Sequence, residues 1–361
     1  MTRTIIMIHP GALGDVLLAL PAIQRIRSAF PDHHLGLIAK REVSRLLTAC
    51  GWIHAAFPIE TEALSGLLTE GKAIQPEVQH WLDWCDIAVC WMADPENHLR
   101  SVFEQAGVRL MIIQSALSSA CRETHQEDRL LEMVAPVISG SKDIQLDSVV
   151  QAYQRSEEVR LSLPREVLAQ GQAELETMGM VGSARRLIAV HPGSGSRHKC
   201  GEPSLFASLI AWCQQSGMTP ILIKGPADDE MAANVLNMCP KPPMILTGET
   251  LLAAAGVLAH AHLFVGHDSG MTHLAAGLHL PTVALFGPTD AQRWAPRGTH
   301  VTVITGGPCS CGGWETVQTC RDKPCLRVSV QTLIEACRQA LNHELHRPSA
   351  QGRLVMSKDL C

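Results

Sequence analysis

The chain has 361 residues, of which 46% are hydrophobic and 18% charged, and its net charge is −5. This length exceeds one ordinary hydrophobic core and suits two domains. The low charged fraction argues against a disordered chain, and the negative charge offers no overall basic field for nucleic acid.

The cysteines and the apolar runs indicate in which cellular compartment the protein is found. The chain has 13 cysteines, an odd number spread over its whole length. Because so large a chain folds without a disulfide framework, we expect free thiols in a reducing cytoplasm. His9, Pro10 and Asp15 interrupt the apolar N-terminus, so we predict no signal peptide. No apolar run reaches the roughly 18–20 residues of a membrane span. We therefore expect a cytoplasmic protein, peripheral at the inner membrane if its substrate is there.

The first half alternates short apolar strands with helices. The predicted strands are Thr4–His9, Leu35–Ala39, Ala55–Ile59, Ile87–Cys90 and Val108–Ile113. The predicted helices are Val16–Phe30, Glu42–Ala49 and Asp128–Ile138. The segment Trp81–Trp84 carries no clear period. This alternation is typical of a parallel sheet covered by helices.

The second half repeats the alternation. We predict strands at Leu187–His191, Pro220–Lys224, Met244–Leu246, Pro281–Phe286 and Val301–Ile304, and another that begins at Leu263. We predict helices at Arg165–Met178, Pro203–Gln215, Asp228–Met238, Leu251–Ala259 and Val330–Leu345. The pattern predicts an α/β chain with one Rossmann-like domain at 1–165, a second at 180–345, and a loose tail at 346–361.

The two halves begin alike. His9-Pro10-Gly11 ends the first strand, and His191-Pro192-Gly193 ends the first strand of the second half. If the two domains face each other across a cleft, both loops lie near one ligand. The alternative is a chance match of two common strand–loop signals.

The stretch from Leu263 to Gly277 reads as a strand, a tight polar turn and a helix of small residues. Such a turn aims backbone N–H groups and the positive end of a helix at the carboxyl edge of a sheet. This edge is where α/β proteins hold an anionic ligand such as a diphosphate.

Four motifs in order resemble glycosyltransferase family 9, the ADP-heptose:lipopolysaccharide heptosyltransferases. They are Gly11-Ala12-Leu13-Gly14-Asp15, His191-Pro192-Gly193-Ser194-Gly195, Asp268-Ser269-Gly270 with His273-Leu274-Ala275-Ala276, and Pro281-Thr282-Val283-Ala284-Leu285-Phe286-Gly287-Pro288-Thr289. The resemblance implies a GT-B fold, with two Rossmann-like domains whose parallel sheets face each other across a cleft. It also implies a lipid-linked acceptor on the N-terminal domain, a nucleotide-sugar on the C-terminal domain, and inverting catalysis without a metal.

Asp15 is the predicted general base, because an inverting transfer needs a carboxylate to take the acceptor hydroxyl proton. Gly11 and Gly14 would let the backbone approach the acceptor closely. The competing interpretation is that Asp15 only caps the helix that follows it.

The turn after the strand at Leu263 is the predicted donor site. Its members are Asp268, Ser269, Gly270, Met271, Thr272 and His273. Here the N–H groups of 270–272 would bind the diphosphate, and Asp268 would contact sugar hydroxyls. The alternatives are a plain N-cap at Asp268 and a hydrogen-bonded core histidine at His273.

Lys199 is the predicted cation for the leaving diphosphate, and Ser194 and Ser196 would add hydroxyl donors. The family motif usually has Trp-Pro just after this lysine, whereas Cys200-Gly201-Glu202 stands here before Pro203. Arg197 or His198 is therefore an alternative holder of the role, and a solvated surface lysine is another.

Three further residues have weaker assignments. Asp228, after a strand and before a helix, is the predicted ribose ligand, although first helical turns are commonly acidic. Lys40 and Arg41 follow the second strand, where they would meet acidic groups of a lipopolysaccharide core.

Cys309, Cys311, Cys320 and Cys325 form a cluster whose spacing lacks the usual Cys-x2-Cys repeat. We therefore favour reduced thiols over a metal site, and we expect no metal or other cofactor.

These observations predict an inverting transferase that moves heptose from ADP-heptose to a lipopolysaccharide core acceptor, with no nucleic-acid partner. A GT-B nucleotide-sugar epimerase and a non-catalytic nucleotide-sugar-binding protein are the alternatives. A nicotinamide enzyme is disfavoured, because neither first loop fits Gly-x-Gly-x-x-Gly.

Overall fold

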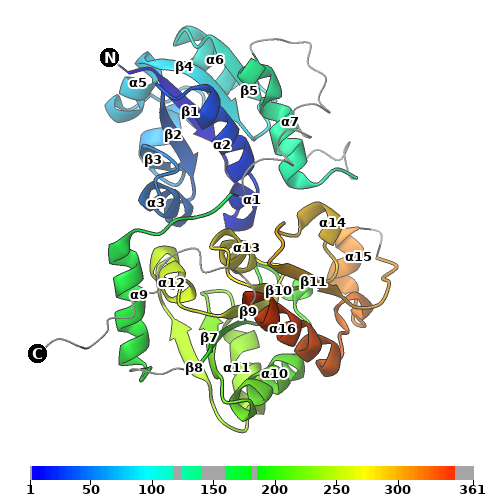
Figure 1. Ribbon diagram of the computed structural model, residues 1–361. Coiled ribbons are helices and arrows are strands. Elements are labelled where there is room, and N and C mark those ends of the chain that lie inside the picture. The colour runs from blue at the N-terminus through cyan, green and yellow to red at the C-terminus, as the bar shows by residue number, and fades with distance from the viewer. Residues whose placement is uncertain (1, 117–122, 140–158, 181–184, 312, 346–361) are drawn as a thin grey trace, which may run out of the picture.

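The structure, a computed structural model, describes residues 2–116, 123–139, 159–180, 185–311 and 313–345. Within these ranges the chain forms two parallel sheets, one above the other in Figure 1, each with helices on both faces. This arrangement confirms the predicted α/β, GT-B architecture. The predicted tail at 346–361 lies outside the described residues.

The N-terminal sheet has the order β3-β2-β1-β4-β5. Its strands are β1 Thr4–Ile8, β2 His34–Ala39, β3 Ala55–Pro58, β4 Cys85–Cys90 and β5 Leu110–Ile113. The helices around it are α1 Leu13–Leu17, α2 Leu20–Ala29, α3 Arg41–Ala49, α4 Ser65–Leu68, α5 Pro76–Asp83, α6 His98–Gln105 and α7 Gln126–Ser139, with a 3-10 turn, η1, at Glu62–Leu64.

The C-terminal sheet has the order β11-β10-β9-β6-β7-β8. Its strands are β6 Leu187–His191, β7 Thr219–Lys224, β8 Met244–Thr247, β9 Leu263–His267, β10 Thr282–Phe286 and β11 Val301–Thr305. The helices are α9 Arg165–Thr177, α10 Pro203–Gln215, α11 Asp229–Met238, α12 Leu251–Leu258, α13 Gly270–Gly277, α14 Ala291–Trp294, α15 Trp314–Thr319 and α16 Val330–Leu345, with 3-10 turns η2 Arg197–Lys199 and η3 Pro324–Leu326.

The central strands are apolar on both faces because helices cover both faces of a parallel sheet. Every residue of β1, β6, β9 and β10 is buried. One hydrophobic cluster continues from the first sheet into the second, and it includes Met7 as well as Phe264. The two halves also touch through helices, since α1 packs on α13 and α3 packs on α12. These contacts fix how the loops of one sheet face those of the other.

Several helices differ from the sequence expectation. The predicted helix Val16–Phe30 is two helices, because the chain turns at Leu18 and Ala19 and restarts with Pro21 in the first turn of α2. The unassigned segment around Trp81 is helical and buries Val78 and Leu82, four residues apart. The helices α4, α6, α14 and α15 were not predicted.

The two sheets fall within the two predicted domain ranges, and α9, which begins at the last residue of the first range and ends before the second, packs on α12. Among the described helices, none combines the length and the apolar character that crossing a bilayer requires.

Candidate functional site

The candidate site lies where the strand order of each sheet reverses. In the C-terminal sheet the chain runs outward from β6 in one direction and from β9 in the other, so the loops after these two neighbours flank a switch point. In the N-terminal sheet β1 and β4 are the corresponding pair. A ligand crevice is therefore expected beside the loops after β1, β6 and β9.

A cavity of about 830 Å³ lies at these loops. Its walls come from both halves of the chain: α1 provides Asp15, and the loops after β6 and β9 provide Ser194 and Asp268. The other lining residues are Ala12, Gly14, Leu18, Gly195, Lys199, Ser269, Gly270, His273, Pro288, Thr289, Asp290, Arg293, Trp294, Cys311, Gly313, Trp314 and Val317. This volume is in the range of sites for drug-sized and cofactor-sized ligands.

The turn after β9 is held by its own side chains. The Ser269 hydroxyl is the N-cap of α13 and accepts a hydrogen bond from the Thr272 N–H, and the Thr272 hydroxyl donates to the His267 carbonyl. Thr272 is fully buried and does not line the cavity. Thr272 therefore shapes the turn by its own hydrogen bonds, and its predicted direct contact with the donor has no support from the cavity lining.

The turn still offers backbone donors to a ligand. Within the described part of the chain, the N–H groups of Gly270 and Met271 have no acceptor, as expected at a helix N-terminus. Gly270 lines the cavity, whereas the Met271 side chain does not. Of the three N–H groups predicted to bind the diphosphate, the Thr272 N–H is already bonded to Ser269. The N–H groups of Gly270 and Met271 remain for an anion.

The turn is connected to the loop after β6 by a buried network. The His191 Nε2 lies 3.0 Å from Asp228 Oδ2, and its Nδ1 lies 3.3 Å from the Ser269 hydroxyl. With a proton on Nε2, His191 donates to Asp228 and accepts from Ser269. Burial raises the pKa of Asp228, but hydrogen bonds from His191 and from the backbone outweigh burial and leave this pKa lowered.

Asp228 therefore serves this network. Its Oδ2 also accepts from the Gly225 N–H at 2.8 Å, and the whole residue is 5% exposed. Asp228 lines a second cavity, next to the first, together with Glu230. Both of these hydrogen bonds fall on Oδ2, so the predicted contact with ribose would have to use mainly Oδ1, and this contact stays a prediction.

Lys199 and Asp268 form an ion pair at the cavity wall. The Lys199 Nζ lies 2.7 Å from Asp268 Oδ2, and the Asp268 side chain is only 8% exposed. The Ser194 hydroxyl donates to the Asp268 carbonyl at 2.6 Å. Arg197 and His198 line the second cavity instead, so Lys199 is the cation of this loop that faces the first one. Ser196 only caps the 3-10 turn η2, where its hydroxyl accepts from the His198 N–H.

Asp15 stands in the first turn of α1, and its Oδ2 accepts from the Ala12 N–H at 2.8 Å. Asp15 therefore does cap the helix, as the competing interpretation held. The cap uses Oδ2, so Oδ1 could still accept a proton from a substrate. Gly11 packs tightly here, since a Cβ at position 11 would lie 2.7 Å from both Asp15 Cβ and His9 Cε1. The loop thus fixes Asp15 in the part of the cavity wall that the N-terminal half provides, whereas Asp268 comes from the C-terminal half.

His273 is one of the residues at which the two halves meet beside the cavity. Burial lowers the pKa of His273 to about 4, so the imidazole is neutral at pH 7. The backbone of Gly14 lies against this ring, where a Cβ would come within 2.9 Å of Cδ2. His273 therefore lines the cavity and also packs against Gly14, and its imidazole is neutral.

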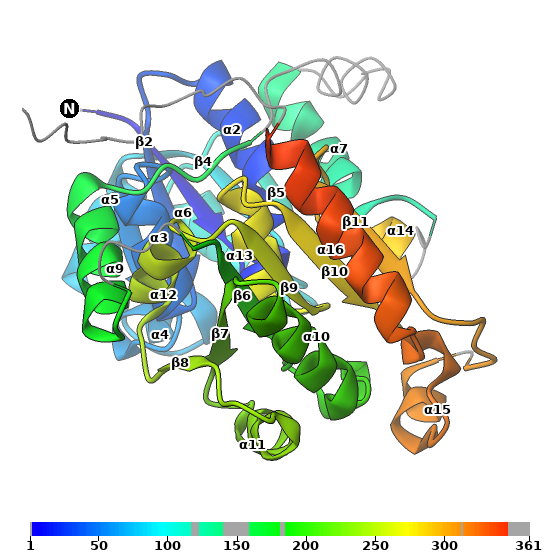
Figure 2. The same ribbon diagram turned by 60° about the horizontal axis from the view of Figure 1, so that its bottom comes forward.

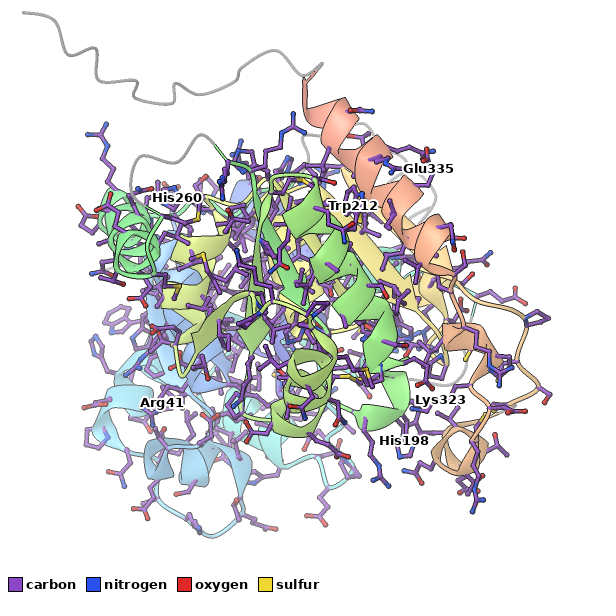
Figure 3. The ribbon with its side chains drawn as sticks, turned by 90° about the horizontal axis from the view of Figure 1, so that it is seen from below. Arg41, His198, Trp212, His260, Lys323 and Glu335 are labelled. Atoms are coloured by element: carbon purple, nitrogen blue, oxygen red, sulfur yellow. The ribbon has the colours of Figure 1, made fainter. Side chains whose placement is uncertain are left out.

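Lys40 and Arg41 do not join the site. Both are exposed at the carboxyl end of β2, and neither lines the cavity of Asp15. In Figure 3 Arg41 lies to the left of His198 and Lys323, well apart from both. The predicted acceptor role of the two cations therefore stays a prediction, made for a place outside the lining of the cavity of Asp15.

The sequence interpretation missed Arg293 and its neighbours. Arg293 lines the cavity, stacks over the Trp294 ring at 5.1 Å, and has a buried Nε with no partner among the described residues. Trp314 lines the cavity from α15. The motif that ends at Thr289 was the available signal, because Arg293 follows it by four residues.

Comparisons with known proteins agree with this architecture. The family model for glycosyltransferase family 9 (heptosyltransferase) matches residues 114–325. The lipopolysaccharide heptosyltransferase 3 of Escherichia coli K12 is 23% identical over 317 residues, which cover 81% of this chain and 85% of that protein.

Two solved structures have a similar fold. A glycosyl transferase family 9 protein from Veillonella parvula has a TM-score of 0.76 at 18% identity, covering 94% of this chain and 98% of that one. The E. coli ADP-heptose LPS heptosyltransferase II has a TM-score of 0.71 at 17% identity, covering 95% and 100%. The match to the family model extends over more than half of the chain and disfavours the epimerase and the non-catalytic interpretations. The chain therefore belongs to glycosyltransferase family 9, the heptosyltransferases, and is a glycosyltransferase.

Proposed function

We propose that this protein transfers a heptose from ADP-heptose to a lipopolysaccharide core acceptor, with inversion at the anomeric carbon and Asp15 as the general base. One observation carries the proposal: Asp15 of the N-terminal half and Lys199, Asp268 and Gly270 of the C-terminal half line a single cavity. An inverting displacement needs a base and a leaving-group site on opposite sides of one reacting carbon.

In this mechanism the acceptor hydroxyl lies beside Asp15, and its oxygen attacks the anomeric carbon. The hydroxyl proton passes to the Asp15 carboxylate. The bond between the anomeric carbon and the β-phosphate oxygen breaks, and its electron pair leaves with ADP. The N–H groups of Gly270 and Met271, at the N-terminus of α13, then stabilise the negative charge that grows on the leaving diphosphate.

Two side-chain cations support transfer without a catalytic metal ion. Lys199 and Arg293 both line the cavity. Lys199 also neutralises Asp268, which lets a carboxylate stand beside a diphosphate site. Asp268 is then placed to accept hydrogen bonds from sugar hydroxyls.

The donor and the acceptor are assigned by analogy with similar proteins. Two solved structures of similar fold are E. coli heptosyltransferases with ADP and with ADP-2-deoxy-2-fluoro heptose, at TM-scores of 0.63 and 0.60. The relative at 23% identity is a lipopolysaccharide enzyme. We therefore propose ADP-heptose as donor, and a lipid-linked saccharide reached from the cytoplasmic surface of the inner membrane as acceptor.

The test combines a donor panel with product stereochemistry. Binding of ADP-, UDP- and GDP-sugars would be measured by calorimetry, and transfer to extracted core acceptors by mass spectrometry. We expect ADP-heptose to bind tightest and the product to have the anomeric configuration opposite to that of the donor, as judged by NMR. A preference for UDP- or GDP-sugars would contradict the assigned donor, and a retained configuration would contradict the role of Asp15.

A further inference from the structure

Two side chains from different halves of the protein form a bidentate ion pair. Arg297 follows α14 in the C-terminal half, and Asp128 lies in the first turn of α7 in the N-terminal half. The Arg297 guanidinium donates to both Asp128 carboxylate oxygens, at 2.6 Å each. A pair with two parallel hydrogen bonds fixes direction as well as distance. The pair therefore holds the segment after α14 to the start of α7.

A further hydrogen bond joins the same two segments. The His125 Nδ1 accepts from the Glu127 N–H at 3.2 Å, so the ring proton of the neutral imidazole is on Nε2. This Nε2 donates to the Ala295 carbonyl at 2.9 Å. His125 is buried, and burial lowers its pKa, which keeps the ring neutral at pH 7. Positions 295 and 297 are thus both bonded across the boundary between the halves.

Two poorly exposed carboxyls face the Arg297 cation. The Asp128 and Glu127 side chains are each 14% exposed, and Glu127 Oε2 lies 3.7 Å from a terminal nitrogen of Arg297. If the guanidinium were lost, both carboxyls would regain water by separation of the halves, which requires no unfolding of either half. The cation therefore favours the arrangement in which the halves are in contact.

This contact lies on the side of the boundary where the cavity is. On the other side α3 packs on α12, and Glu42 accepts from the Leu251 N–H at 3.1 Å. Figure 1 shows α3 above α12 on one side of the molecule and α7 above α14 on the other, and in Figure 2 α7 and α14 again lie next to each other. None of the described lining residues belongs to α3 or α12, whereas α14 provides Arg293 and Trp294.

The contact is connected to the groups of the proposed reaction by short paths. Only Ala295 and Pro296 separate Arg297 from Trp294, and the proline ring restricts the backbone between them. On the other side of the boundary α7 packs on α2, which directly follows α1 and Asp15. A change in the separation of α7 and α14 is therefore passed to both walls of the cavity.

We propose that Arg297 is a positioning residue for the transfer: its pair with Asp128 holds the two halves at the separation at which Asp15 and Arg293 act on the same pair of substrates. The inference rests on the proposed function, because a reaction whose base and leaving-group site come from different halves needs that separation fixed. The Arg297 side chain is 42% exposed, so solvent screens the pair and it adds little to global stability. Its loss should therefore lower the rate much more than the stability.

Steady-state kinetics and calorimetry test this role. For Arg297→Ala we expect kcat to fall by about tenfold to a hundredfold, with donor affinity within about twofold of native, since Arg297 does not line the cavity. Arg297→Lys keeps the charge without the bidentate geometry and should lie between the two. Arg338→Ala is the control, because its ion pair with Glu335 stays within α16. Native turnover in Arg297→Ala, or a donor affinity that falls as much as kcat, would overturn the proposal.

A double-mutant cycle tests whether the two side chains act as a pair. Asp128→Asn should lose about as much activity as Arg297→Ala, and the variant with both changes should lose no more than either alone. If the two losses multiply instead, Arg297 and Asp128 act separately and the proposal fails.

Hydrogen exchange of the full chain without substrate measures the contact apart from transfer. In Arg297→Ala and Asp128→Asn the amides of α14 and of the first turn of α7 should exchange at least about threefold faster than in the native protein. The amides of α16 should keep their native rate, which separates loss of the contact from general unfolding. Native exchange rates in α7 and α14 would overturn the proposal. If the native protein transfers no heptose, the proposed function fails, and the exchange rates still show whether Arg297 holds the halves together.

Discussion

Gly14 lies directly against the His273 imidazole, and this contact joins the two halves of the protein inside the cavity. Gly14 belongs to α1 of the first half and His273 to α13 of the second. Because His273 is only 6% exposed, the ring has little room to move. The spacing between Asp15 and the turn at Asp268 therefore depends on the absence of a side chain at position 14.

Gly14→Ala should push α1 away from α13. The added Cβ would lie 2.9 Å from His273 Cδ2, a separation that folded proteins avoid. Since a displacement of about 1 Å at a reacting centre can cost a factor of about 100, we expect kcat to fall by about tenfold to a hundredfold. Gly307→Ala is the comparison, because a Cβ there would come no closer than 3.9 Å, to the Pro324 carbonyl oxygen, and Gly307 does not line the cavity. If both variants lose the same activity, the contact does not set the geometry.

Asp15→Asn separates the two roles of this side chain. The amide oxygen of asparagine still accepts from the Ala12 N–H, so the loop should keep its shape, whereas the amide takes no proton. We expect kcat to fall by about 10²–10⁴ and the calorimetric affinity for the donor to stay within about twofold. Asp32→Asn, at an exposed carboxylate of the same half, should behave as the native enzyme. Normal turnover by Asp15→Asn would remove this residue from the mechanism.

The sequence predicted the sheets well, because buried parallel strands such as Leu187–His191 are continuous apolar runs with loops at fixed ends. It located Asp15, Lys199 and Asp268 in one cavity because motifs follow those strands. Short helices such as α14 were missed, since four residues are too few to show a helical period.

The side-chain roles were less predictable. Asp228 looks like a ligand by its position in the chain, yet its partners are His191 and Gly225, which only the folded geometry brings together. Arg293 was missed because no strand ends immediately before it. The convergence of Cys320 with Cys309 likewise depends on a turn between residues far apart in the sequence.

The ion pair between Lys199 and Asp268 should matter to both folding and donor binding. Lys199→Met leaves a carboxylate with 8% exposure without its cation, although solvent screens the pair because Lys199 is 26% exposed. We expect a loss of about 1–3 kcal/mol in the free energy of unfolding and at least a tenfold weaker donor affinity. Lys241→Met, an exposed lysine of the same half, is the control.

Adding Asp268→Asn to Lys199→Met should then recover part of the stability but none of the donor affinity. Chemical denaturation and calorimetry measure the two quantities separately. If the loss of stability in the double variant equals the sum of the losses in Lys199→Met and Asp268→Asn alone, the two side chains act independently.

Stability should fall as the pH is lowered from about 6.5 to about 4. Burial lowers the pKa values of His9, His267 and His273 to about 4, whereas unfolded histidine titrates near 6.5. In this window the unfolded chain binds more protons, so each histidine removes up to about 3 kcal/mol of stability as the pH falls. Urea unfolding at a series of pH values measures the slope, and a flat profile would contradict the neutral buried histidines.

Glu127 opposes these histidines. Burial raises its pKa to about 7, so the folded state binds the extra proton between about pH 7 and 4.5 and gains stability as the pH falls. The free energy of unfolding of Glu127→Gln should therefore fall more steeply with decreasing pH than that of the native protein. Glu123→Gln, an exposed carboxyl nearby, should leave the slope as in the native protein.

Arg293→Ala should weaken transfer more than binding of the sugar donor alone. The Arg293 guanidinium lines the cavity with a buried Nε that lacks a partner among the described residues, as expected of a group that meets an anion only when a ligand is bound. If it stabilises the leaving diphosphate as charge develops, kcat should fall by about 10²-fold, with a smaller change in donor affinity. Arg338→Ala is the matched control, because Arg338 also stacks on a tryptophan, Trp212 at 5.7 Å, but lies on α16 outside the cavity. Equal effects of the two variants would mean that Arg293 contributes only its stacking on Trp294, and the positive charge in the cavity would then rest on Lys199.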